Sequence, residues 1–102
     1  MSKTLEELQR LVFLEYCEHG FMHKFNDAGE IGDVAELGLI TTEVSEVIEA
    51  VRKNQDNVGE ECADIIIRTL NFMTRKGLHA DLEIMKKNVI NEERAFMHGK
   101  KV

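Results

Sequence analysis

The chain has 102 residues, with 13 lysines and arginines against 19 aspartates and glutamates, so its formal net charge is −6. This length fits one domain over residues 1–102, and a composition of 43% hydrophobic and 31% charged residues excludes both a disordered chain and a membrane protein. No apolar run approaches the roughly 20 residues that cross a bilayer, and a negative surface disfavours nucleic acid as a partner.

The N-terminal segment MSKTLEELQR has no apolar stretch behind a basic one. We therefore expect no signal peptide and a cytoplasmic location. A chain of this size buries roughly two-thirds of its unfolded surface, which leaves little core to spare. We expect it to self-associate.

Apolar residues recur every three or four positions and proline is absent, so the sequence predicts an all-α fold. The first helix should start at Thr4, as N-cap, and stop near Gly20. The segment FMHKFNDAGEIG at 21–32 contains glycines and an Asn-Asp pair, which predicts a loop. Asp33 should cap a second helix that runs to about Lys53.

Two more helices are expected after a polar turn at 54–57. The third should end at Gly77, a residue typical of helix C-termini. The fourth should begin near Ala80 or Asp81 and lead into the basic tail HGKKV. The expected architecture is a four-helix bundle with one longer loop after the first helix.

Charge is distributed unevenly. Residues 28–66 contain ten acidic and two basic residues, whereas residues 67–102 contain eight basic and four acidic ones. The two regions could meet at one site that holds a metal ion and a polyphosphate, or they could simply attract each other.

Two carboxylate pairs lie within the predicted second and third helices. Glu43 and Glu46 are three residues apart and share a helix face, and Glu61 and Asp64 repeat this spacing. Asp64 lies in ECADIIIRTL among apolar residues, where we expect little solvent, so it needs a partner. That partner is either Arg68, one turn further on, or a cation.

Four carboxylates on neighbouring helices repel one another unless a cation lies between them. Oxygen ligands alone select hard divalent ions, chiefly Mg²⁺, with Mn²⁺ as a common substitute. A di-iron bundle would need Glu-x-x-His pairs, and no histidine of this chain has a glutamate three residues before it.

The arrangement of Glu43-Val-Ser-Glu46, fourteen intervening residues and Glu61-Cys-Ala-Asp64 resembles the ExxE…ExxD signature of the MazG-like all-alpha nucleoside triphosphate pyrophosphohydrolases. The segments TTEVSEVIEAVRK and GEECADIIIRTLNF are similar to the core of the small phage and bacterial members. The C-terminal segment is similar to the KxxxNxxRxxxHGKK ending of those members. The resemblance covers roughly residues 34–102. The matching C-terminal residues are Lys87, Asn91, Arg94, His98 and Lys100.

This resemblance implies a MazG-like bundle that hydrolyses a nucleoside triphosphate between the α and β phosphates, releasing the monophosphate and pyrophosphate. It implies that Glu43, Glu46, Glu61 and Asp64 hold Mg²⁺ and carry the catalysis, and that the C-terminal residues bind substrate. Family members are generally dimers or tetramers with sites near subunit interfaces, so a homodimer or homotetramer is expected.

Asn71 departs from the pattern, because relatives often have aspartate seven residues after the motif aspartate. Two other functions remain open: a catalytically silent protein of the same fold that binds nucleotide or metal, and a helical interaction module whose carboxylates form ordinary ion pairs. The sequence does not specify the base, the sugar or the number of metal ions.

Overall fold

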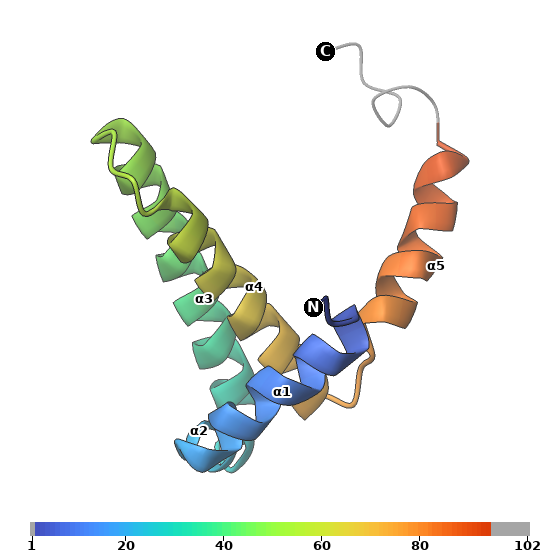
Figure 1. Cartoon of the computed structure of the whole chain (residues 1–102). Coiled ribbons are helices and arrows are strands. Elements are labelled where there is room, and N and C mark those ends of the chain that lie inside the picture. Colours follow the sequence, from blue (N-terminus) through green and yellow to red (C-terminus); the bar gives the residue numbers. More distant parts are fainter. Residues whose placement is uncertain (1, 95–102) are drawn as a thin grey trace.

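The computed structural model describes residues 2–94, which form five helices and no strands (Figure 1). These are α1 (Leu5–Glu18), α2 (Phe21–Asn26), α3 (Gly29–Arg52), α4 (Val58–Arg75) and α5 (Ala80–Glu92). The prediction of an all-α fold is confirmed. Long helices α3 and α4 pair as a hairpin, α1 and α2 cover its base, and α5 leads away from it (Figure 1).

Helix ends follow the local sequence closely. Thr4 is the N-cap of α1, and its hydroxyl accepts a hydrogen bond from the Glu7 N–H while the Glu7 side chain accepts one from the Thr4 N–H. This capping box satisfies two amides that the helix itself leaves unpaired. Gly20 and Gly77 follow α1 and α4 with φ of 82° and 75°, a region that glycine enters without a Cβ clash. The predicted ends of these two helices are confirmed.

The predicted loop at 21–32 is wrong, because this segment forms α2 and the first turn of α3. Gly29 turns the chain at φ 62°. Gly32 lies inside α3, where an added Cβ would stand 1.9 Å from the Phe25 carbonyl oxygen. This glycine is therefore a close-packing residue that lets α2 lie against α3, rather than a loop residue.

The predicted capping role of Asp33 is also wrong, because α3 begins four residues earlier. Asp33 instead pairs across the hairpin, with its carboxylate 2.7 Å from Arg75 Nη2 and 2.7 Å from Lys76 Nζ. Arg75 also lies 2.9 Å from Glu36 Oε1, and the hydroxyl of Tyr16 donates to Glu36 Oε2 at 2.5 Å. This buried polar network joins α1, α3 and α4.

The apolar core of one chain is small. The buried hydrophobic residues are Tyr16, Phe25, Ala50, Leu70 and Ala80. Many large apolar side chains of the long helices are exposed, and the radius of gyration is 16.0 Å, against about 13 Å for a compact domain of 100 residues. The four-helix bundle that the sequence predicts is thus not closed within one chain.

No helix within residues 2–94 combines the length and the hydropathy needed to cross a bilayer.

Candidate functional site

Three of the four motif carboxylates converge between the paired helices. Glu43 and Glu46 come from α3 and Glu61 from α4, and each offers an oxygen within 4.8 Å of the other two. Glu43 and Glu61 are half-buried and Glu46 is exposed. We call these three residues the carboxylate cluster. Its oxygen donors and their spacing fit a hard divalent cation.

The cluster is electrostatically crowded. Partial burial, a hydrogen bond with Glu46, and the negative charges of Glu46, Asp64 and Glu43 together raise the pKa of Glu61. Like charges held this close favour either a shared proton or a bound cation. The arrangement therefore has a physical reason to bind one or the other.

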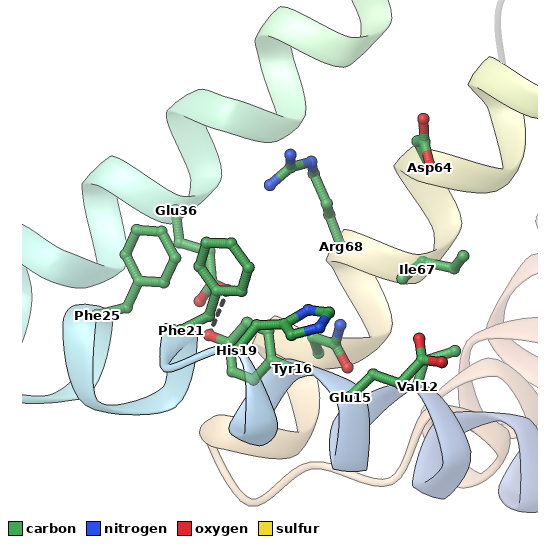
Figure 2. A pocket seen from close by; sticks show the side chains of 11 residues that line it. Val12, Glu15, Tyr16, His19, Phe21, Phe25, Glu36, Asp64, Ile67 and Arg68 are labelled. Carbon is green, nitrogen blue, oxygen red and sulfur yellow. Dashed lines mark hydrogen bonds between the residues drawn. The ribbon is translucent and has the colours of Figure 1, made fainter.

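Asp64 differs from the sequence prediction. It is exposed, so the expectation that little solvent reaches it is wrong; Ile66 and Ile67, its apolar neighbours in sequence, are exposed as well. Arg68 pairs with Glu43 rather than with Asp64, its Nε lying 3.2 Å from Glu43 Oε1. In Figure 2 the Arg68 guanidinium extends toward α3 and lies apart from the Asp64 carboxylate. The negative charge of Asp64 still raises the pKa of Glu61, and the role of Asp64 as a metal ligand stays a prediction.

The predicted substrate-binding residues lie on another part of the fold. Lys87 and Asn91 are exposed on α5, and Arg94 follows the end of that helix. Figure 1 shows α5 diverging from the α3/α4 hairpin, so one chain does not bring these residues to the carboxylate cluster. His98 and Lys100 lie outside the described residues.

Beside the cluster is a cavity of about 180 Å³ between α1, α2, α3 and α4 (Figure 2). We call it the aromatic pocket, after Tyr16, Phe21 and Phe25 in its wall. The rings of Tyr16 and Phe21 stack with centroids 5.9 Å apart, and those of Phe21 and Phe25 with centroids 6.3 Å apart. Asp64, Arg68 and Asn71 line it from α4, so the pocket adjoins the cluster through Arg68.

No protein-family model, no curated protein and no solved structure matches this chain. What the site can do is therefore inferred from its own geometry and from its motifs.

The sequence did not predict the aromatic pocket or the buried network beneath it. Phe21 and Phe25 fall within the predicted loop, and in a loop the spacing of aromatic residues does not show which side chains share a face. Glu36 and Arg75 offered one usable signal: Glu36 precedes Glu43 by seven residues and Arg75 follows Arg68 by seven, so each continues the site face of its helix by two turns.

Proposed function

We propose that this protein is a divalent-cation-dependent nucleoside triphosphate pyrophosphohydrolase that releases a nucleoside monophosphate and pyrophosphate. The observation that carries the proposal is the convergence of Glu43, Glu46 and Glu61 from two helices, with donor oxygens within 4.8 Å of one another. If these carboxylates only covered solvated faces of their helices, their side chains would not need to converge. A role in controlling the nucleotide pool fits this chemistry and a cytoplasmic location.

In this proposal Glu43, Glu46 and Glu61 hold Mg²⁺, with Mn²⁺ as an alternative, and Asp64 joins them. A bound divalent ion supplies charge neutralisation at the phosphates and a more acidic water. The carboxylates would hold the ion, and one of them would accept the proton from the attacking water. Arg68, held by Glu43, presents its remaining N–H groups beside the cluster, where a phosphate oxygen can accept them.

The proposal includes assembly into a homodimer or homotetramer. Exposed apolar side chains on the long helices and α5 support it, because a monomer rarely leaves so many in water. They include Val44, Ile48, Val51, Ile66, Leu82, Met85 and Val89. A second copy could also bring Lys87, Asn91 and Arg94 to a carboxylate cluster that their own chain leaves out of reach. Light scattering coupled to size-exclusion chromatography tests this directly: a monomer at micromolar concentration contradicts it.

A matched pair of variants tests the function. Glu61→Gln removes one cluster charge, and Glu60→Gln makes the same change at the neighbouring exposed residue. We expect Glu61→Gln to lower the rate of pyrophosphate release about 100-fold or more, and Glu60→Gln to leave it near the wild-type value. Equal effects of the two variants would contradict the assignment.

Two further outcomes separate the alternatives. Cation and nucleotide binding without turnover on any triphosphate would favour a catalytically silent binding protein. Loss of folding, rather than loss of cation binding, in both Glu61→Gln and Asp64→Asn would favour an interaction module whose carboxylates are structural.

A further inference from the structure

We propose that the aromatic pocket is a pyrimidine-base subsite and that Asn71 reads the edge of the base. The inference rests on the proposed function, because it takes the carboxylate cluster as the position of the phosphates. It adds to that function a substrate class and a specificity-determining residue.

The first observation is an unpartnered buried amide. Asn71 is 5% exposed, lines the pocket, and its Oδ1 has no hydrogen-bond partner. A buried acceptor without a donor is costly, and native proteins seldom keep one that has no use. An N–H group of a ligand in the pocket would satisfy it.

The second observation is the chemistry of the wall. Phe21 is half-exposed at the pocket, and its ring lies between those of Tyr16 and Phe25 in a stacked series. A planar base packs against the ring edges of such an aromatic wall whatever its identity, while a polar group at the edge of the base supplies the discrimination. The pocket therefore combines an aromatic wall with one directional hydrogen-bonding group.

The volume suits a small ring. An apolar cavity of about 150 Å³ accommodates benzene. The pocket, at about 180 Å³, therefore matches one six-membered ring with its substituents better than a fused purine. Both pyrimidine types present an N–H donor on the Watson–Crick edge, the 4-amino group of cytosine or the N3–H of uracil and thymine, so either can pair with Asn71.

The position of the pocket fits a nucleotide whose phosphates lie at the cluster. Glu61, Asp64, Arg68 and Asn71 follow one another at three- and four-residue spacing on one face of α4, and Asn71 is ten residues beyond Glu61 of the cluster. At 1.5 Å per residue this separation is roughly 15 Å along the helix axis. That length is comparable to an extended nucleoside triphosphate, so base and phosphates can occupy the two places at once.

The test is calorimetric binding of nucleoside monophosphates, which does not require turnover. The wild-type protein with Mg²⁺ is titrated with CMP, UMP, AMP and GMP and with inorganic pyrophosphate. We expect the pyrimidine monophosphates to bind about tenfold more tightly than the purine ones. In Asn71→Leu the pyrimidine affinity should fall about tenfold, while pyrophosphate affinity stays unchanged.

Two more variants test whether the effect comes from the Asn71 amide itself. Asn88→Leu makes the same change at an exposed residue of α5 and should not alter base preference. Asn71→Asp accepts hydrogen bonds only, so it should favour CMP over UMP, because uracil O4 would face a second acceptor. If Asn71→Leu fails to fold, the shift toward CMP in Asn71→Asp still decides the question.

The outcomes separate the two proposals. Hydrolysis of triphosphates with no pyrimidine preference, or with a preference that Asn71→Leu and Asn71→Asp leave intact, overturns the subsite and spares the proposed function. Pyrimidine binding that depends on Asn71, in a protein that hydrolyses no triphosphate, supports the subsite and overturns the pyrophosphohydrolase.

Discussion

Arg68 on α4 donates a hydrogen bond from Nε to Oε1 of Glu43 on α3, across 3.2 Å, so a cationic side chain occupies part of the carboxylate cluster. The guanidinium offsets some of the charge crowding there. It also competes for an oxygen that a metal ion would use.

Replacing Arg68 therefore should strengthen cation binding. We expect Arg68→Met to increase Mg²⁺ affinity about tenfold, since a unit charge and a divalent ion near 5 Å apart in water repel by roughly 1.7 kcal/mol before screening by salt. Calorimetric titration of Mg²⁺ measures this. Arg10→Met, at an exposed arginine paired with Glu6, is the control and should leave the affinity unchanged. Weaker Mg²⁺ binding in Arg68→Met would mean that the arginine organises the cluster rather than competing within it.

The crowding at Glu61 has a consequence for stability. The pKa of Glu61 is raised, so its protonation stabilises the fold at pH values below the ordinary glutamate pKa, and this stabilisation is lost as the pH rises through the raised value. Without a divalent ion, Glu61→Gln should therefore have a higher Tm than the wild type at pH 7, with the difference vanishing in acid. Thermal melts from pH 4 to pH 8 measure it.

Magnesium should reverse this order. Adding Mg²⁺ at pH 7 should raise the Tm of the wild type and leave that of Glu61→Gln nearly unchanged, because a ligand stabilises only the state that binds it. A wild-type Tm that ignores Mg²⁺ would count against the cluster as a cation site.

Arg75 belongs to the buried polar network next to the site, where it pairs with Asp33 and Glu36. Its side chain is 1% exposed and holds the carboxylate of Glu36, itself 3% exposed. Arg75→Leu leaves that carboxylate buried without its cationic partner, with only the Tyr16 hydroxyl still donating to it, and should destabilise the protein by about 3–5 kcal/mol in urea unfolding. Glu36→Leu in the same chain removes the orphaned charge and should recover most of the loss. A double variant no more stable than Arg75→Leu would show that Glu36 does not require this partner.

Gly32 sets the contact between α2 and α3. A Cβ at this position would lie 1.9 Å from the Phe25 carbonyl oxygen, so Gly32→Ala forces the two helices apart and should cost about 1–3 kcal/mol. Gly38→Ala, in the same helix with nothing within 4 Å of the new methyl group, should instead be neutral or slightly stabilising. Chemical unfolding of both variants makes the comparison. Equal stabilities would mean that α2 is not packed as described.

The sequence predicted the start of α1 and the end of α4 well, because their signals are local. Thr4 with Glu7 specifies a capping box, and Gly77 terminates α4 at the expected place. The same local signals are misleading at Gly32 and Asp33. Gly32 looks like a loop residue in sequence, but it packs closely against α2. Asp33 looks like a helix cap, but its carboxylate pairs with Arg75 and Lys76 across the hairpin.

The candidate site was predictable in part. The i, i+3 spacing placed Glu43 and Glu46 on one face and indicated Glu61 as their counterpart on α4. It could not show that Asp64 is exposed, or that Arg68 pairs with Glu43, because both depend on the rotation of α4 against α3. The burial of Asn71 without a donor for its Oδ1 is likewise a tertiary property, which helix spacing does not encode.

The most direct test of the proposed pyrophosphohydrolase activity is to separate the products that the purified protein forms from nucleoside triphosphates, with Mg²⁺ and with a chelator. We expect nucleoside monophosphate and pyrophosphate in equal amounts, only with Mg²⁺. Release of orthophosphate and a nucleoside diphosphate, or turnover unaffected by the chelator, would contradict it.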